Sequence, residues 1–298
     1  MSANDQMQRF IFSDTDLRGE IVSLQDTYQQ VRSNNAKAEK QLPESVLQLL
    51  GEFLAAACLL SSSLKFNGML TLQARGEGDV TVLMAESSNQ KNLRGVVQLA
   101  ENCDVSTLAG KSLSELLGSG MLVVVIEPDK GERYQGVVPL EKPTLAENLE
   151  DYFAQSEQLK TRFWLRSNER QVGGLMLQAL PQQLSNEDDY AANWQTAEAL
   201  ASTVKDDELF ELTHAELLYR LFNEFELRLF DEESVQFACS CSRERCEATL
   251  RNFGRPELDE IISEQDLITI DCHFCNQKYQ FGPLDIDEMF KLDSPELH

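Results

Sequence analysis

The stretch that decides how this chain is organised is Cys239-Ser240-Cys241, followed after thirty intervening residues by Cys272-His273-Phe274-Cys275. Five of the seven cysteines lie between Cys239 and Cys275, whereas the 238 residues before them hold only Cys58 and Cys103. Two close cysteine pairs, each able to grip one side of a metal ion, are typical of a tetrahedral zinc site. The spacing therefore predicts one zinc ion per chain, held by Cys239, Cys241, Cys272 and Cys275.

Two neighbouring side chains compete for a place in this ligand set. Cys246 follows Cys241 by five residues, and His273 lies inside the second cysteine pair. Four thiolates are the preferred set, which leaves Cys246 as a spare thiol. Four protein ligands close the coordination shell and leave no open position for an activated water, so the pattern argues against a zinc hydrolase.

The C-x-C spacing of the first pair also bears on redox chemistry. A disulfide across one intervening residue closes a small, constrained ring, which is expected to be strained and easily reduced. Zinc holds its sulfur ligands as thiolates, the form that oxidants attack. The four cysteines are therefore better suited to a reversible switch than to a permanent crosslink.

The residues around the cysteines predict a small C-terminal module, residues 235–298. Residues 268–281 indicate two short strands joined by a turn, with Asn276 placed where a left-handed backbone is tolerated. A helix is expected after Arg255-Pro256, and an amphipathic stretch covers residues 284–290. A module of this size buries so little surface that it is marginal alone, and zinc typically contributes about 10–16 kcal/mol in such folds. Loss of the metal is expected to unfold it.

Charge and composition narrow the possible partners. Fifty acidic residues against twenty-six basic ones give a net charge of −24, which repels nucleic-acid phosphates and anionic lipid. The apolar fraction of 42% is enough for buried cores, no run of eighteen apolar residues occurs, and the N-terminus lacks a secretory signal pattern. A cytoplasmic protein that binds neither nucleic acid nor membrane is expected. In that compartment, clustered cysteines indicate metal or redox chemistry.

Residues 1–181 are predicted to form an α+β domain built on a mostly antiparallel sheet. A long helix over residues 43–64 is apolar nearly all round between Phe53 and Leu60, which indicates a central buried position. Thr144 and Glu147 form a capping-box pattern at the start of another helix. The predicted strands cover residues 9–12, 19–24, 69–75, 79–85, 94–99, 121–127, 134–140, 162–166 and 174–180, and the helices cover 26–33, 43–64 and 145–159.

Residues 182–234 differ from the preceding domain, since strand signals vanish and a helical linker is predicted. Capping patterns begin at Ser185 and at Thr213. Residues 186–234 hold fourteen acidic residues against three basic ones, and such unbalanced charge destabilises a compact state. The segment is either marginal unless it packs on something, or an ordinary helical subdomain with a solvated acidic face. After Thr213 one apolar helical stripe is predicted, which is also the candidate client-binding surface: Leu217, Leu218, Leu221, Phe222, Phe225 and Leu229.

The whole chain resembles the bacterial redox-regulated 33 kDa chaperonins, a family of heat-shock holdases. The most specific similarity is the stretch Cys239-Ser240-Cys241-Ser242-Arg243-Glu244-Arg245-Cys246 together with Cys272-His273-Phe274-Cys275, at the spacing of the family. Further similarity lies in Arg18-Gly19-Glu20-Ile21-Val22, Leu64-Lys65-Phe66-Asn67-Gly68, Leu70-Thr71-Leu72-Gln73 and Tyr134-Gln135-Gly136-Val137-Val138-Pro139-Leu140.

This resemblance implies an ATP-independent chaperone that is inactive when it is reduced and zinc-bound. Peroxide or hypochlorous acid, especially with heat, would form the disulfides Cys239–Cys241 and Cys272–Cys275 and release zinc. The C-terminal module and the linker would then unfold and expose apolar surface that holds unfolding client proteins. The family also implies a homodimer in the oxidised form.

Two other classes of function remain open. A zinc-ribbon protein that binds nucleic acid needs a basic face, but the only basic cluster is Arg243, Arg245 and Arg251 in acidic surroundings. A thiol-disulfide redox enzyme needs one exposed cysteine pair of low pKa rather than four cysteines closed around a metal. No nucleophile–base motif or phosphate-loop motif occurs, so the chain is not expected to be an enzyme.

Overall fold

The computed structural model describes residues 5–37, 41–62, 67–89, 91–184 and 186–291, and they fall into two compact units. The first unit extends to Ala238 and the second begins at Cys239. The sequence places a domain boundary after residue 234, and it treats residues 182–234 as a separate linker; this three-part division stays a prediction. In the structure, residues 186–238 belong to the first unit.

The first unit contains two sheets, where the sequence predicts one. In the first sheet the strand order is β10-β1-β2-β9-β8, and β11 pairs with the end of β1. All its pairs are antiparallel. The strands are β1 Gln6–Phe12, β2 Leu17–Leu24, β8 Thr161–Ser167, β9 Val172–Ala179, β10 Leu227–Leu229 and β11 Glu233–Ser234.

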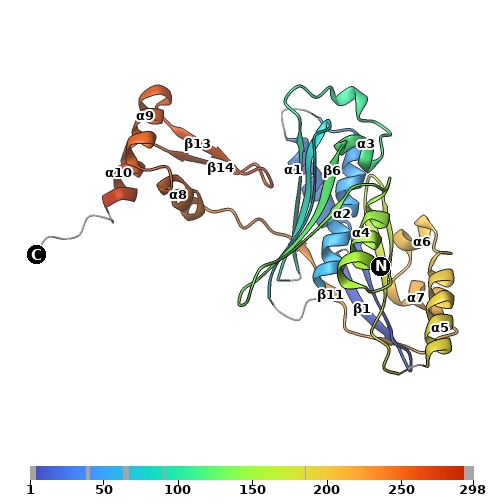
Figure 1. Cartoon of the computed structure of the whole chain (residues 1–298). Helices are drawn as coiled ribbons and strands as arrows, with labels where there is room; N and C mark the ends of the chain where they lie inside the picture. The colour runs from blue at the N-terminus through green and yellow to red at the C-terminus, as the bar shows by residue number, and fades with distance from the viewer. Residues whose placement is uncertain (1–4, 38–40, 63–66, 90, 185, 292–298) are drawn as a thin grey trace, which may run out of the picture. The chain divides into compact units, whose positions relative to one another are not determined.

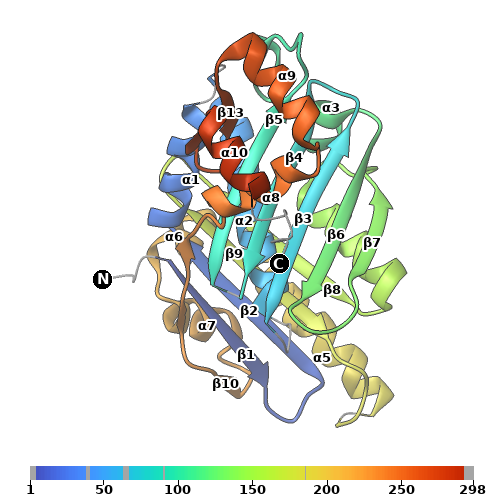
Figure 2. The same cartoon turned by 90° about the vertical axis from the view of Figure 1, so that its left-hand side faces the viewer.

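The second sheet has the order β12-β5-β4-β3-β6-β7, and all its pairs are antiparallel except the parallel pair of β12 with β5. Figure 2 shows the strands β3 to β7 of this sheet. The bounds are β3 Gly68–Gly76, β4 Val80–Ser88, β5 Asn92–Leu99, β6 Gly120–Pro128, β7 Tyr134–Pro139 and β12 Gln236–Phe237. The predicted α+β fold with mostly antiparallel strands is confirmed.

Helix α2, Glu44–Ser62, lies between the two sheets (Figure 1). Every residue from Phe53 to Ser62 is buried, so the all-round apolar character of this stretch is explained by packing against both sheets. By length and composition alone α2 is able to cross a membrane, but 78% of its most apolar window is buried inside the unit. A helix that is apolar on every side needs a cover on every side, which is why the strands split into two sheets.

Shorter elements close the ends of this core. Helix α1, Asp26–Ala36, packs beside β5, and the buried carboxylate of Asp5 accepts bonds from the Gln25 and Thr27 amides at its start. The predicted capping box of Thr144 and Glu147 is confirmed at the start of α4, Leu145–Tyr152, which continues as a π-helical turn over Phe153–Glu157. The remaining pieces are a 3-10 turn, Val105–Thr107, and α3, Leu113–Leu117.

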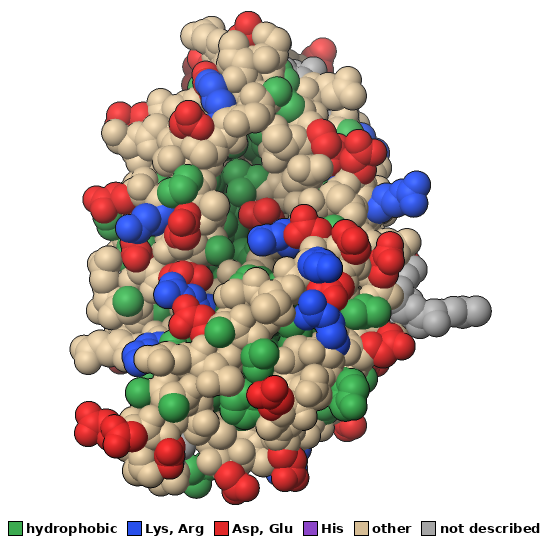
Figure 3. All heavy atoms as spheres, turned by 90° about the vertical axis from the view of Figure 1, so that its right-hand side faces the viewer, with side chains coloured by type: hydrophobic (Ala, Val, Ile, Leu, Met, Phe, Trp, Pro, Cys, Tyr) green, Lys and Arg blue, Asp and Glu red, His purple; other side chains and the backbone are tan. Residues whose placement is uncertain are grey.

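Three helices from the acidic segment cover the outer face of the first sheet: α5 Glu187–Ala201, α6 Asp206–Glu211 and α7 His214–Phe222 (Figure 1). Asn186 caps α5, whereas Ser185 lies outside the described residues. The capping box of Thr213 and Glu216 at α7 is confirmed. Figure 3 shows acidic side chains spread over this side of the molecule. Apolar residues of the three helices, among them Trp194, Leu209 and Leu218, are buried in one cluster with residues of the first sheet.

The prediction that residues 182–234 are wholly helical is wrong at the C-terminal end of the segment. Helix α7 ends at Phe222, so the single helical stripe does not continue to Phe225 and Leu229. Phe225 follows in a turn, and Leu229 belongs to β10 and is 39% exposed. The strands β10 and β11 are only three and two residues long, and they form because β1 offers them an unpaired edge. A pairing of this kind leaves little local sequence signal.

The second unit is built around a small apolar core and one hairpin. The predicted strands are confirmed as β13, Ile268–Asp271, and β14, Lys278–Phe281, which pair antiparallel. The predicted helices are α9, Arg255–Gln265, and α10, Pro283–Lys291, while α8, Arg243–Arg251, is not predicted by the sequence. The core consists of six buried residues: Leu250, Leu258, Ile268, Phe281, Ile286 and Met289.

Candidate metal centre

The second cysteine pair sits on the turn between β13 and β14. Two hydrogen bonds close this turn: the Cys272 amide donates to the Gln277 carbonyl at 3.0 Å, and the Asn276 amide donates to the Cys272 carbonyl at 2.8 Å. Asn276 has a φ of 58°. Asparagine tolerates this left-handed conformation better than most residues, as predicted from the sequence. The turn therefore holds Cys272 and Cys275 on one side of the hairpin end.

Backbone amides are directed at the sulfurs of this turn. The amides of Phe274 and Cys275 donate to the sulfur of Cys272, and the amide of Gln277 donates to the sulfur of Cys275. In the first pair, the amide of Cys241 donates to the sulfur of Cys239. Such bonds favour the charged thiolate over the neutral thiol, so the backbone is already arranged to support metal ligands.

The first cysteine pair lies between β12 and α8. Ser242 caps α8 by accepting a bond from the Arg245 amide, which fixes where the helix begins. The Arg245 guanidinium then donates to both the carbonyl and the hydroxyl of Ser240, at 2.9 and 2.8 Å. These contacts hold the single residue between Cys239 and Cys241 in place and turn both sulfurs toward the hairpin.

The sulfurs of Cys239, Cys241, Cys272 and Cys275 all lie within 4.8 Å of one another. The shortest contacts run between the pairs, with 3.6 Å from Cys239 to Cys272 and 3.4 Å from Cys241 to Cys275. Zinc–sulfur bonds of about 2.3 Å in a tetrahedron place the sulfurs about 3.8 Å apart. The four free thiols are thus arranged as a tetrahedral metal ion requires, and they can hold one.

The four thiols do not ionise alike. Burial raises the pKa of Cys239, but the Cys241 amide and the neighbouring thiols outweigh it and lower the value to about 7. Burial raises the pKa of Cys272 and of Cys275, and in Cys275 the surrounding sulfurs add to the effect. Four thiolates this close repel one another, and a divalent cation removes that repulsion. The donor set and its electrostatics both fit zinc.

The two competing side chains lie outside this group. Cys246 is on α8, partly buried against the apolar core of the second unit, and burial raises its pKa. His273 is exposed on the turn. Sequence reasoning missed Tyr279 of β14, whose hydroxyl lies 3.2 Å from the sulfur of Cys241. The feature of the sequence that could have indicated Tyr279 is its place in the hairpin, where it pairs with Ile270 and follows Cys275 by four positions.

Arg243 joins three elements of the second unit. Its guanidinium pairs with Asp285 of α10 and Glu247 of α8, donates to the Gln280 carbonyl at 2.9 Å, and stacks 4.4 Å from the centre of the Phe281 ring. Because Arg243 and Arg245 are both engaged inside the unit, the small basic cluster noted in the sequence serves the fold around the cysteines.

The candidate client-binding residues lie in the first unit, at the interface between the acidic segment and the first sheet. Leu217, Leu218, Leu221 and Phe222 are each at most 2% exposed. Phe222 and Phe225 pack on Phe12 of β1, with ring centres 5.1 Å apart in both cases. These four side chains are therefore covered in this structure, whereas the sixth candidate, Leu229, is 39% exposed.

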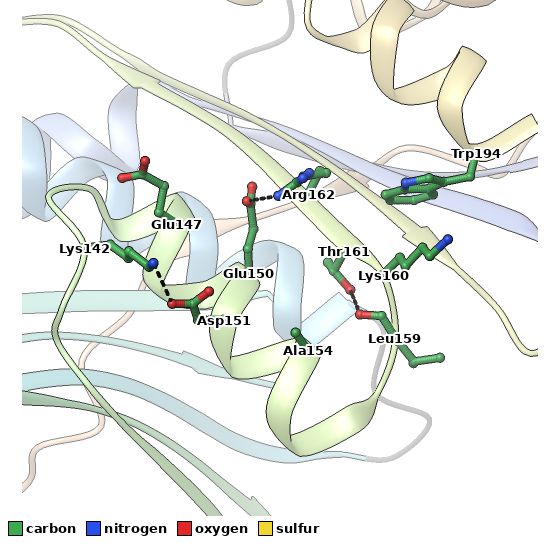
Figure 4. A pocket seen from close by; sticks show the side chains of 10 residues that line it. All are labelled: Lys142, Glu147, Glu150, Asp151, Ala154, Leu159, Lys160, Thr161, Arg162 and Trp194. Atoms are coloured by element: carbon green, nitrogen blue, oxygen red, sulfur yellow. Dashed lines mark hydrogen bonds and ion pairs between the residues drawn. The ribbon is translucent and has the colours of Figure 1, made fainter. Parts of the chain in front are cut away.

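Arginines of β8 also fasten the acidic segment. Arg162 pairs with Glu150 of α4 and, at 2.6 Å, with Glu198 of α5, and Arg166 pairs with Asp206 of α6 at 2.7 Å. Figure 4 shows Glu150 and Arg162 facing each other in a pocket of about 540 Å³, beside Trp194 of α5. Burial raises the pKa of Glu150 in this pocket. The charged groups of the pocket thus hold α4, β8 and α5 together.

Together, the fold and the site define a class of protein: a two-sheet unit that carries a docked acidic segment, followed by a small unit in which four clustered cysteines can hold a metal ion. The model of the family described as Hsp33 protein matches residues 5–282. The 33 kDa chaperonins of Pseudomonas paraeruginosa and Shewanella loihica are 44% and 42% identical, over 97% of this chain and 96% of each relative.

The crystal structure of the 33 kDa chaperonin of Thermotoga maritima has the same fold, with a TM-score of 0.80 at 24% identity over 98% of this chain and all of that one. The chain belongs to the Hsp33 family of 33 kDa chaperonins. Membership of this family supports a chaperone role for the chain.

Proposed function

We propose that this chain is a redox-regulated, ATP-independent holdase, which is inactive while reduced and zinc-bound and active after oxidation. The observation that carries the proposal is the convergence of four thiols within 4.8 Å in a unit whose apolar core has only six buried residues. A core this small depends on the metal centre for its stability. The state of the four sulfurs therefore controls whether the second unit is folded.

Zinc would be held by Cys239, Cys241, Cys272 and Cys275, and when bound it keeps all four sulfurs as thiolates. In each pair, one thiolate attacks one oxygen of a hydrogen peroxide molecule, the O–O bond breaks, and a sulfenic acid and hydroxide are formed. The second thiolate of the pair then attacks this sulfur and displaces hydroxide, which forms the S–S bond. Two peroxide molecules give the disulfides Cys239–Cys241 and Cys272–Cys275, after which no thiolate remains for the metal.

Unfolding of the second unit would spread into the first through β12. This strand has two residues, and it ends two positions before Cys239. Its bonds to β5, from Gln236 N to Lys91 O and from Ala238 N to Leu93 O, are the last attachments before the metal centre. Once they open, the segment 187–235 is free to leave the first sheet and uncover its apolar side chains, which would bind unfolding clients in the cytoplasm.

The oxidised form is expected to be a homodimer, since the uncovered apolar face of one copy has an equivalent face on a second. Neither nucleic acid nor membrane is proposed as a partner. The net charge of −24 opposes both, and the arginines near the metal centre are engaged within the second unit.

The test is light scattering from a heat-aggregating client. Reduced, zinc-loaded protein is compared with protein treated with peroxide at warm temperature, and suppression only after oxidation supports the proposal. Cys246→Ser is the matched control, because it removes a nearby thiol outside the metal centre and is expected to behave as the wild type. Equal suppression in both redox states would remove the switch, and no suppression in either state would refute the holdase.

The disulfide pairing needs its own test, because the shortest sulfur contacts run between the two pairs. Trypsin cleavage places Cys239 and Cys241 on the fragment 229–243 and Cys272 and Cys275 on the fragment 252–278. The proposed pairing leaves two separate fragments, and each is about 2 Da lighter than its reduced form because one disulfide bond replaces two S–H bonds. Pairing of Cys239 with Cys272 or of Cys241 with Cys275 would instead give one linked fragment, which contradicts the proposal.

A further inference from the structure

The outer edge of β1 pairs with the backbone of the acidic segment, and side-chain contacts add to this pairing. Gln8 Nε2 donates to Phe230 O at 2.8 Å, and the Arg9 guanidinium pairs with Glu233 at 3.4 Å and lies 5.5 Å from the centre of the Phe230 ring. Phe230 N donates to Arg9 O at 2.9 Å, and Ser13 N donates to Glu226 O at 2.8 Å. At the other end of the strand, Val235 N donates to the carbonyl of residue 5 at 3.0 Å. These main-chain bonds all involve odd-numbered residues of β1. The alternation of an antiparallel ladder places the amide of Ile11 on the same side.

This cover is short and shallow. Strands β10 and β11 contribute three and two residues, and of β10 only Leu227 is half-buried, while Arg228 and Leu229 are exposed. The cover is therefore held mainly by main-chain hydrogen bonds, each worth about 0.5–1.5 kcal/mol. Departure of residues 226–235 exposes a row of unpaired amides and carbonyls along β1, and of the departing side chains only Val235 is buried in the core of the unit.

Two other edges, those of β5 and β8, carry side chains that protect them independently of the segment. On β5, the amide of Asn35 from α1 donates to Gly95 O and accepts from Val97 N, both at 3.1 Å. On β8, the carboxylate of Glu150 accepts from Phe163 N at 3.1 Å. Side chains that occupy edge groups in this way prevent further strand pairing. Among these three edges, β1 is the one that becomes available when the segment leaves.

The residues that now occupy this edge indicate what fits there. Leu227 and Leu229 alternate along β10 and lie opposite Phe12 and Phe10 of β1. Phe10 and Phe12 are buried and belong to the apolar face of the first sheet, which the segment covers. An occupant of this edge is therefore extended, pairs through its main chain, and carries apolar side chains at alternate positions.

We propose that the outer edge of β1, residues 5–13, is the acceptor strand onto which an extended segment of an unfolding client adds in place of residues 226–235. The proposal rests on the holdase function proposed above, and it specifies how the client is recognised. Main-chain pairing tolerates many sequences, whereas the apolar face that carries Phe10 and Phe12 favours alternating apolar residues. Unfolding proteins expose such segments in quantity.

The test uses full-length oxidised protein and a peptide with the sequence of residues 226–235. In one peptide the amide nitrogen of Phe230, which donates to Arg9 O, is methylated; in the control the methyl group is on the amide of Leu229, which faces away from β1. The two peptides have identical side chains. Fluorescence anisotropy is expected to show at least tenfold weaker binding of the Phe230-methylated peptide, and equal binding of both would overturn the proposal.

A second measurement uses an unfolded client in place of the peptide. Residue-resolved hydrogen exchange of the oxidised protein is expected to show new protection at the amides of Arg9, Ile11 and Ser13 when the client is added. The even-numbered amides of β1 already pair with β2 and are expected to change little. Uniform protection, or none, would overturn the proposal, because burial under apolar side chains does not alternate along a strand.

These measurements distinguish a failure of the acceptor-strand proposal from a failure of the proposed holdase function. If oxidised protein prevents client aggregation while the alternating protection is absent, the holdase stands and the acceptor strand is wrong. If no aggregation is prevented, the proposed function itself fails. Protection of the same amides that increases with protein concentration in the absence of client would assign the edge to a second copy of the chain, and it would overturn recognition of clients there.

Discussion

Replacing Phe12 with alanine is expected to loosen the acidic segment in the reduced protein. Phe12 is 2% exposed, and its ring contacts Phe222 and Phe225, both contributed by the segment. A buried phenylalanine side chain covers about 150 Å² or more, which at about 25 cal/mol per Å² is worth about 4 kcal/mol. This agrees with the roughly 3–5 kcal/mol measured for such truncations in protein cores.

Only part of this loss concerns the docking of the segment. The two edge-to-face contacts account for about 0.5–1.5 kcal/mol each beyond area burial, so docking weakens by about 1–3 kcal/mol. That corresponds to a shift of about 5- to 150-fold in the equilibrium between docked and released segment. The matched control is Phe53→Ala, which removes an equally buried ring from α2 within the core between the two sheets.

The assay is hydrogen exchange of peptides from α5 to α7 in reduced, metal-loaded protein, together with urea unfolding. Both variants are expected to lose global stability, but only Phe12→Ala is expected to accelerate exchange in residues 187–222 beyond its global effect. It is also expected to prevent some client aggregation without oxidation. Equal local exchange in the two variants would refute the reasoning, because the segment would then not depend on the contacts of Phe12.

Three further perturbations test other parts of the structure. Burial lowers the pKa of His214 from 6.5 to about 4. As the pH falls, the unfolded state therefore binds a proton at this histidine before the folded state does, and the free energy of unfolding decreases between about pH 6.5 and 4 by at most about 3 kcal/mol. Urea unfolding at pH 7.5 and 4.5 is expected to show a smaller loss for His214→Gln than for the wild type, and identical losses would contradict this. Cys272→Ser is expected to weaken zinc binding at least tenfold, measured by competition with a chelator, and to loosen the second unit in reducing buffer. An unchanged zinc affinity would mean that Cys246 or His273 serves as a ligand. Arg166→Gln is expected to weaken docking of α6 by at most about 1 kcal/mol, seen as faster exchange at low salt and little difference at high salt; a difference that persists in high salt would contradict an electrostatic contact.

The cluster of four cysteines was largely predictable from the sequence, because the spacing within each cysteine pair is local information. The C-x-C and C-x-x-C spacings each place two sulfurs within reach of one ion, and Asn276 marks the left-handed turn. Helical spacing likewise predicted the buried helix α2, and local turn and capping patterns predicted the hairpin of β13 and β14 and the capping boxes at Thr144 and Thr213. Each of these features depends on residues that are close together along the chain.

The sequence did not predict features that depend on a distant partner. Helix α8 was missed because its only strong local signal is the Ser242 cap, and Tyr279 was missed because its contact with Cys241 crosses 38 positions. The division into two sheets follows from the need to cover α2 on both sides, which no single strand reveals. The sequence left two interpretations of residues 182–234 open, and the surface on which the segment packs, the first sheet, is visible only in the tertiary structure.

The amino-acid sequence by itself thus determined the ligand set to be tested, the α+β class and the amphipathic character of the acidic segment. Only the tertiary structure decided where that segment packs. Its helices lie on Phe10 and Phe12, its acidic side chains pair with arginines of β8, and residues 226–235 lie along the edge of β1. The physical reason is that side-chain chemistry and turn propensity act between near neighbours. Edge pairing and the burial of one apolar face against another depend on which surfaces the rest of the chain leaves uncovered.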